Sequence, residues 1–211
     1  MKIISTNIGQ PKVITWNNKQ EKTGIFKEPT TLPIYLGKQD VKDDEVSNRK
    51  VHGGEFKACY LFSAEQYPYW KNRYPNLNWD YGMFGENLTI SGLDETKLII
   101  GSIYEIGNAK VEITQPREPC YKFGLKFGNQ QVLNQFIEHS YPGTYVRVLK
   151  EGIVKTGDNL SLIKTPKKSL TTFDFFKLLY SKDKEQDLLK LAINNEAIPL
   201  KKRQKLSVFL K

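Results

Sequence analysis

Short apolar segments separated by glycine and other turn-forming residues run through the first 165 residues of this chain. Residues 12–16 and 19–23, for example, flank Asn17-Asn18 in the pattern of a β-hairpin. Many short strands with few helical segments favour a mainly β fold, a barrel or a compact β-rich domain. The other strands are expected at residues 58–62, 88–91, 97–106, 110–114, 144–149 and 159–163.

Two helices are expected between these strands. Ser63-Ala-Glu-Gln66 has the form of a capping box, but Pro68 would remove a backbone donor from a helix begun at Ala64, so the helix is predicted to start nearer Tyr67. Residues 129–140 form the second, with apolar side chains repeating on one face.

The pattern changes after Pro166 to three short helical segments. Thr171-Thr-Phe-Asp174 is predicted to cap a helix carrying Phe173, Phe176 and Leu179; a second covers about 184–193, and a third begins near Pro199 and carries Leu206, Phe209 and Leu210. Helices this short cannot hold a core alone, so they must pack together or on the barrel. We expect a barrel domain at 1–165 and a three-helix extension at 166–211.

The composition indicates a globular protein, with 39% hydrophobic and 12% aromatic residues in 211. No stretch approaches a transmembrane length, and the N-terminus lacks the apolar core of a signal peptide. Cys59 and Cys120 have no zinc-type spacing, and without a secretion signal a disulfide between them is disfavoured. We therefore expect a cytoplasmic protein that does not act at a membrane.

The net charge of +9 is concentrated at the C-terminal end, where residues 164–211 hold 12 basic and 5 acidic residues. Solvated lysine-rich helices are the ordinary explanation, and an acidic protein partner or an anionic cofactor are the alternatives. No nucleic-acid-binding motif accompanies the charge, so nucleic acid is not expected. The aromatic, basic tail is also a candidate for a homodimer contact.

The segment Thr114-Gln-Pro-Arg-Glu-Pro-Cys120-Tyr-Lys122 carries the strongest chemical signal. Pro119 restricts the backbone, which predicts a rigid loop rather than a helix at Cys120. Arg117 and Lys122 would favour the thiolate, the form that attacks electrophiles or binds soft metals. A structural cysteine is more often surrounded by apolar residues, as Cys59 is, and Cys59 is expected to be a small buried hydrophobe.

This segment, read with Thr23–Lys27, Lys50–Gly54 and Phe84–Leu88, resembles the MOSC family, domains related to the C-terminal part of molybdenum cofactor sulfurase. The order and spacing are most similar to its bacterial YiiM-type branch, and the resemblance runs from about residue 1 to the C-terminus. It implies a β-barrel that binds a molybdopterin-type molybdenum cofactor, with Cys120 as a protein ligand to molybdenum. It also implies a three-helix C-terminal extension.

The resemblance implies an oxidoreductase that reduces N-hydroxylated compounds, such as N-hydroxylated purine bases, to amines with loss of water. Because the sequence has no flavin, nicotinamide or iron–sulfur motif, electrons would come from a separate flavin-type reductase. Two alternatives remain open. Cys120 could serve a sulfur-carrier or cofactor-delivery module without redox chemistry, or the basic tail could serve an interaction protein.

Three single residues are site candidates beside Cys120. Arg117 is expected to hold anionic groups of the cofactor, the alternative being a surface ion pair with Glu118 or Glu112. Asn87 offers a donor and an acceptor to pterin or phosphate, and Lys27 matches a family lysine expected at the cofactor's phosphate. By itself Lys27 would be read as an ordinary exposed lysine.

His52-Gly53-Gly54 is the remaining candidate. Two glycines let the backbone approach an anion, and His52 can donate to phosphate or move protons, which makes it a catalytic candidate. Alone, such a turn is more often structural. His139 is expected to be a plain helix-terminal residue.

Two acidic positions complete the set. Glu86 is a potential proton carrier, although a solvent-facing turn carboxylate is the commoner case. The loop Asp43-Asp44-Glu45-Val46 departs from the family's pattern except at Asp44; it is expected to border the entrance and to affect specificity.

Overall fold

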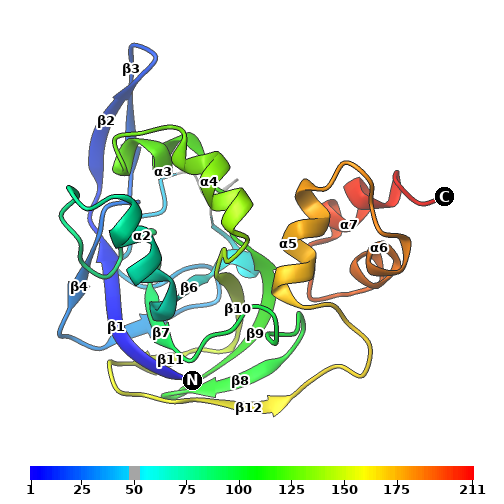
Figure 1. Cartoon of the computed structure of the whole chain (residues 1–211). Helices are drawn as coiled ribbons and strands as arrows, with labels where there is room; N and C mark the ends of the chain where they lie inside the picture. The colour runs from blue at the N-terminus through cyan, green and yellow to red at the C-terminus, as the bar shows by residue number, and fades with distance from the viewer. Residues whose placement is uncertain (48–52) are drawn as a thin grey trace.

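A curved, eight-stranded sheet forms the framework of the molecule in this computed structural model, which describes residues 1–47 and 53–211 (Figure 1). Its strand order is β12-β8-β9-β10-β6-β7-β1-β4, and β6 and β7 pair in parallel where the other neighbours are antiparallel. The strands are β1 Lys2–Gly9, β4 Lys27–Thr30, β6 Cys59–Ser63, β7 Leu88–Ser91, β8 Ile103–Ile106, β9 Ala109–Pro116, β10 Thr144–Lys150 and β12 Leu160–Lys164.

The sheet curls so that its edge strand β12 comes into contact with β1. The amide of Leu160 donates to the carbonyl of Met1 at 2.9 Å, and the amide of Ile3 donates to the carbonyl of Asp158 at the same distance. A single bridge between Lys2 and Asn159 joins the same segments, so the contact is local rather than a full ladder. The mainly β fold with inserted helices is thus confirmed, in a barrel-like form.

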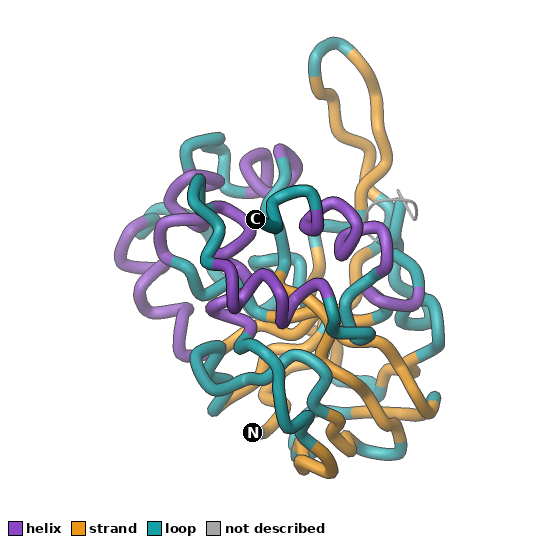
Figure 2. Tube along the Cα trace, turned by 90° about the vertical axis from the view of Figure 1, so that its right-hand side faces the viewer, coloured by secondary structure: helices purple, strands orange, loops and turns teal. Residues whose placement is uncertain are grey.

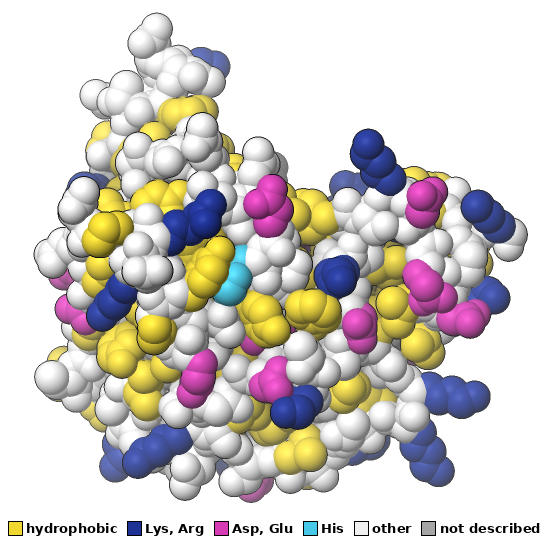
Figure 3. Space-filling view, viewed as in Figure 1, with side chains coloured by type: hydrophobic (Ala, Val, Ile, Leu, Met, Phe, Trp, Pro, Cys, Tyr) yellow, Lys and Arg dark blue, Asp and Glu magenta, His cyan; other side chains and the backbone are white. Residues whose placement is uncertain are grey.

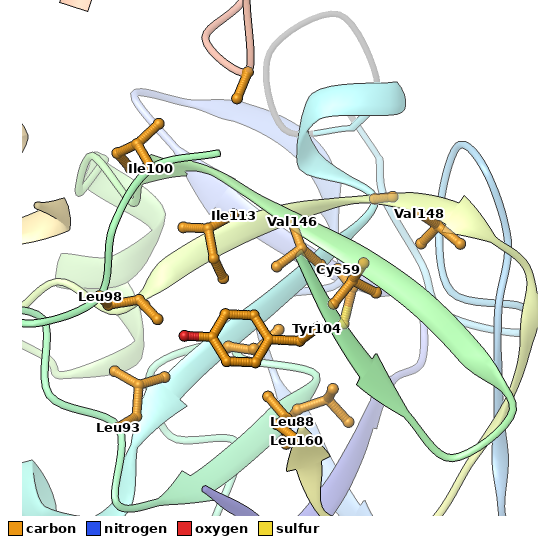
Figure 4. Packing of buried hydrophobic residues seen from close by; sticks show 14 of the residues in the cluster. Cys59, Leu88, Leu93, Leu98, Ile100, Tyr104, Ile113, Val146, Val148 and Leu160 are labelled. Carbon is orange, nitrogen blue, oxygen red and sulfur yellow. The ribbon is translucent and has the colours of Figure 1, made fainter. Parts of the chain in front are cut away.

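Apolar side chains from successive strands fill the interior of this curved sheet (Figure 4). Ile113, Val146 and Leu88 are fully buried. Cys59 lies among them and is 1% exposed, as its apolar surroundings predicted. Burial raises the pKa of the Cys59 thiol well above its usual range. Each such side chain contributes about 1.5–3 kcal/mol by leaving water.

Two small antiparallel pairs complete the β structure. The predicted hairpin is confirmed as β2 Lys12–Trp16 and β3 Lys19–Thr23, and it projects alone from the body (Figure 2). Asn17 and Asn18 both have positive φ, 48° and 61°, as a two-residue hairpin turn requires. The second pair joins β5 Ile34–Leu36 to β11 Gly152–Val154.

Short helices cover one side of the sheet over a cluster of aromatic rings. Trp70, Phe84 and Phe136 form the centre of this cluster and are fully buried. Pro68 lies in the first turn of α2, where the sequence analysis put the helix start. The helices are η1 Glu55–Lys57, η2 Ala64–Gln66, α2 Tyr67–Arg73, α3 Tyr121–Lys126 and α4 Val132–His139.

The three predicted C-terminal helices are present as α5 Thr172–Tyr180, α6 Gln186–Ile193 and α7 Leu200–Ser207. The Thr171 hydroxyl accepts from the Asp174 amide at 2.9 Å, which confirms the predicted cap. Apolar side chains of these helices join the same buried cluster as the strands, so the helices dock on the sheet. The division into 1–165 and 166–211 stays a prediction.

Some expected details were wrong. The strand predicted at 97–106 is limited to β8, and Phe209 and Leu210 lie beyond the end of α7 instead of on it. Lysine and arginine side chains are dispersed among acidic and apolar ones on the face shown in Figure 3. Every helix in the described part of the chain is too short or too polar to cross a membrane.

Candidate functional site

A pocket brings together four of the predicted site residues: Lys27, Asn87, Arg117 and Cys120. Each lies at the end of a regular element, Lys27 at the start of β4, Asn87 before β7, Arg117 after β9 and Cys120 before α3. The hollow contains about 720 Å³ of space between the atoms, including open solvent. Side chains far apart in the sequence thus meet at one place because the strand and helix ends meet there.

Cys120 occupies a loop position, as Pro119 predicted. Its backbone is extended, with φ −131° and ψ 168°, and its side chain is partly exposed. The carbonyl of Cys120 accepts from the amide of Phe123 at 2.8 Å, which starts α3 immediately after the thiol. The thiol is therefore held at a fixed junction and remains reachable from the pocket.

The β2–β3 hairpin braces the residues that follow Cys120. The ring of Tyr121 stacks on Trp16 with centroids 5.1 Å apart, and its hydroxyl donates to Glu21 at 2.5 Å. Lys122 donates to the carbonyl of Lys22 at 3.0 Å and lies 3.4 Å from Glu21. The projecting hairpin thus fixes one side of the loop that carries the thiol.

Arg117 is a buried cation, 5% exposed, enclosed by aromatic rings. Its guanidinium carbon lies 4.6 Å from the centre of the Phe123 ring, 5.4 Å from Tyr60 and 5.6 Å from Phe136. Its Nη1 is buried without a hydrogen-bond partner among the described residues. A buried donor left unpaired costs about 1–3 kcal/mol, so this atom is suited to an anionic ligand.

The alternative of a surface ion pair for Arg117 does not agree with the structure. Glu112 is paired with Arg147, and Glu118 lies 2.5 Å from the amino group of Lys202. Both acids considered as partners of Arg117 are thus bonded to other cations.

Lys27 is not the exposed lysine that the sequence by itself suggested. It is 9% exposed and forms a buried ion pair with Asp44. The carboxylate of Asp44 also accepts from the amide of Gly9 at 2.7 Å and from the side chain of Asn87 at 2.9 Å, while the Asn87 oxygen accepts from the amide of Tyr60 at 3.2 Å. Lys27, Asp44 and Asn87 all line the pocket, so this network forms part of its wall.

The predicted His-Gly-Gly turn is only partly described. His52 lies outside the described residues, while Gly53 and Gly54 border a groove beside the pocket. Gly54 has φ 90°, a conformation that favours glycine. The loop Asp44–Ser47 does line the pocket, in line with its expected position at the entrance.

Glu86 has a structural role, whereas the sequence suggested either a proton carrier or a solvent-facing turn carboxylate. It is 0% exposed and accepts from the amides of Gly82 and Phe84 at 2.9 and 3.1 Å and from the hydroxyl of Thr89 at 2.8 Å. It is therefore a buried, hydrogen-bonded carboxylate and not a solvent-facing one. His139 ends α4, as expected, and lies 2.7 Å from the side-chain oxygen of Gln66.

Lys57, Tyr60 and Tyr145 also line the pocket and were not predicted as site residues. Burial, followed by the neighbouring charge of Lys202, lowers the pKa of Lys57. Burial raises the pKa of Tyr60 and of Tyr145. Both tyrosines lie in strands whose apolar runs look like core, so no local signal distinguished them.

A metal in this pocket would have Cys120 as its protein ligand. Among residues 1–47 and 53–211, no cluster of three or more His, Cys, Asp or Glu side chains is arranged to hold a metal ion. A single soft thiolate suits a metal that brings its own organic ligand.

Comparison with known proteins identifies the class to which this barrel and pocket belong. The family model of the MOSC domain matches residues 48–161. YflK of Bacillus subtilis (strain 168) is 34% identical over 169 residues, which cover 80% of this chain and 76% of YflK. The chain belongs to the MOSC domain family.

Within that family the chain is of the YiiM type. The crystal structure of YiiM from Geobacillus stearothermophilus has a TM-score of 0.83 and 30% identity, covering 100% of this chain and 99% of that one. A protein named "Reductase" from Gibberella moniliformis is 31% identical over 147 residues, 68% of this chain but 26% of its own length. The chain thus matches about a quarter of that longer protein.

Proposed function

We propose that the pocket binds a molybdenum cofactor of the molybdopterin type and that the protein reduces N-hydroxylated compounds to amines. The proposed substrates include N-hydroxylated purine bases. The observation that carries the proposal is the shared pocket of the Cys120 thiol and the buried guanidinium of Arg117 in a MOSC-family chain. The fungal relative named as a reductase supports a redox activity.

The residues present fit such a cofactor. It is anionic, and its high-valent molybdenum is already held by sulfur atoms of the pterin, so a thiolate is a compatible further ligand. The pocket offers such a thiol together with a buried donor, Arg117 Nη1, that has no partner among the described residues. The aromatic rings around Arg117 hold the guanidinium in place, which lowers the entropic cost of binding an anion.

We assign the following roles. Cys120 would be the ligand to molybdenum, and Arg117 would bind an anionic group of the cofactor. Lys27 and Asn87 would contact the cofactor only by exchanging part of their bonding to Asp44. His52, Gly53 and Gly54 stay proposed cofactor contacts, of which only the two glycines are described, at the groove beside the pocket.

When bound, the cofactor supplies two-electron redox chemistry at its metal. Conversion of an N-hydroxylamine to an amine breaks the N–O bond, consumes two electrons and two protons, and releases water. Lys57 is suited to donate one proton at its Nζ, because burial lowers the pKa of its ammonium group and so makes it a stronger acid. His52 is the second proposed proton carrier. Electrons would come from a separate flavin-type reductase.

The test is an activity assay with protein prepared in a host that makes the cofactor. An N-hydroxylated purine base is supplied with a chemical reductant, and the amine product is measured by chromatography. Wild type should form the amine and Cys120→Ala should not, while Cys59→Ala, which alters a thiol in the core, should retain activity when folded. Equal activity of wild type and Cys120→Ala would refute the assigned role.

A second candidate function is sulfur transfer or cofactor delivery without redox chemistry. The partial exposure of Cys120 favours it, because a carrier thiol must reach both its donor and its acceptor. Sulfane sulfur on Cys120 in purified protein that holds neither molybdenum nor pterin would support this candidate over the reductase.

A further inference from the structure

A second hollow adjoins the pocket, between the barrel and the C-terminal helices. We call it the lysine groove and define it by Lys57, Lys184, Lys201, Lys202 and Lys205, all of which line it. It contains about 1300 Å³ of space between the atoms, including open solvent.

The lysine groove adjoins the pocket that holds Cys120. Lys57 and Glu118 line both hollows. Glu118 is two residues before Cys120, and its carboxylate lies 2.5 Å from the amino group of Lys202 on α7. A ligand whose reacting end lies beside Cys120 therefore has the groove within reach of its other end.

The groove is positively charged, with five lysines and two glutamates, Glu55 and Glu118, in its lining. Some of its lysines are already engaged. Lys184 donates to the carbonyls of Leu178 and Leu179 at 2.6 and 3.0 Å, and Lys202 is paired with Glu118.

Lys201 and Lys205 are the two available cations of the groove. Both are exposed on α7, and neither forms an ion pair or a side-chain hydrogen bond with another residue of the described chain. Two ammonium groups one helical turn apart on one helix form a ready site for a phosphate group.

We propose that the lysine groove binds the phosphate of the substrate and that the preferred substrates are N-hydroxylated purine nucleotides rather than free bases. This inference rests on the proposed reductase function. A nucleotide presents a base, a hydroxylated sugar and a phosphate in that order. The two hollows present the thiol pocket, the Glu118 carboxylate and the unpaired lysines in the same order.

The first experiment compares kcat/KM for an N-hydroxylated purine base, its ribonucleoside and its 5′-monophosphate at low ionic strength. We expect the monophosphate to exceed the ribonucleoside by about tenfold, since about 1.4 kcal/mol is typical of one or two charge-assisted hydrogen bonds. The double variant Lys201→Gln/Lys205→Gln should lose this preference and keep the kcat/KM of the free base. The matched control is Lys167→Gln/Lys168→Gln, which removes the same charge from exposed lysines outside the groove and should retain the preference.

The second experiment does not depend on turnover. Binding of AMP and adenosine to the full chain is measured by calorimetry, and molybdenum content is measured in the same preparations. AMP should bind about tenfold more tightly than adenosine. The groove variant should lose that difference and the control variant should keep it, with equal molybdenum content in all three proteins.

The outcomes separate this inference from the function on which it rests. If none of the three substrates is reduced, the proposed function fails, while AMP binding still tests the groove. If the free base is reduced but the phosphate adds nothing, or its effect survives in the groove variant, the inference is overturned. Loss of molybdenum from the groove variant would also overturn it, because the lysines would then hold the cofactor.

Discussion

The amino group of Lys202 lies 2.5 Å from the carboxylate of Glu118 and thereby ties the last helix to the loop that carries Cys120. Lys202 is largely shielded, with a side chain 17% exposed, whereas that of Glu118 is 44% exposed. The C-terminal helices are thus fastened to the edge of the candidate site.

Breaking this link should cost little stability. Lys202→Met and Glu118→Gln, alone and combined, are expected to show a coupling free energy of about 0.2–1 kcal/mol, because water screens the exposed carboxylate. Urea unfolding of the four proteins measures it. Strictly additive effects would mean that the pair does not stabilise the fold.

The buried pair of Lys27 and Asp44 should behave differently. Asp44→Asn removes the charge that compensates Lys27, and we expect a loss of about 3–5 kcal/mol in the free energy of unfolding. The double variant Lys27→Met/Asp44→Asn should recover part of that loss. Asp187→Asn, in an exposed pair with Lys190, is the control and should cost under about 1 kcal/mol. Equal effects at the two sites would contradict the account.

Glu95 predicts a pH dependence of stability. Burial raises the pKa of its carboxyl from 4.5 to about 7, although one oxygen accepts from the amide of Gly143 at 3.0 Å. Between pH 4.5 and 7 the folded state therefore binds more protons than the unfolded state, so stability falls as pH rises through this window. At pH 8 the ionised group costs up to about 3 kcal/mol.

Glu95→Gln isolates this contribution. The variant should be more stable than wild type at pH 8 and differ less from it at pH 4.5, as followed by urea unfolding across the range. A difference between the two proteins that does not change with pH would exclude Glu95 as its source.

Arg117 should contribute more to binding than to folding. In cofactor-free protein, Arg117→Met removes the contacts with three rings, which stabilise the fold. It also removes the unpaired Nη1, which destabilises the fold, so the two effects have opposite signs. The free energy of unfolding should therefore change by less than about 1 kcal/mol, while pterin content after expression in a cofactor-competent host falls sharply. Undiminished pterin content would contradict a role for Arg117 in binding.

Most strands were predictable because local patterns determined them. The hairpin at residues 12–23 follows from Asn17-Asn18, and the cap at Thr171 follows from Asp174 three residues later. The strand β11 was not predicted because Gly152 looked like a turn. A Cβ there would lie 2.6 Å from the backbone of Asn108, so this glycine permits a close approach between distant segments.

The candidate site was predictable where a motif gave its residues and not where the fold supplied them. Cys120, Arg117, Lys27 and Asn87 meet in one pocket, and their sequence motifs had singled them out. The pairing of Lys27 with Asp44 depends on contacts between β4 and a loop 17 residues away, which no local pattern encodes. Helix α3 was missed because its glycine, Gly124, packs against the side chain of Gln130 rather than forming a turn.

The most direct test of the central claim is the molybdenum and pterin content of purified protein, with X-ray absorption to count sulfur ligands to molybdenum. We predict near-stoichiometric molybdenum in wild type and in Cys59→Ala. Cys120→Ser should lose the metal or retain it with one sulfur ligand fewer. Cys120→Ser protein with full molybdenum and an unchanged sulfur count would contradict the assignment of Cys120 as the ligand.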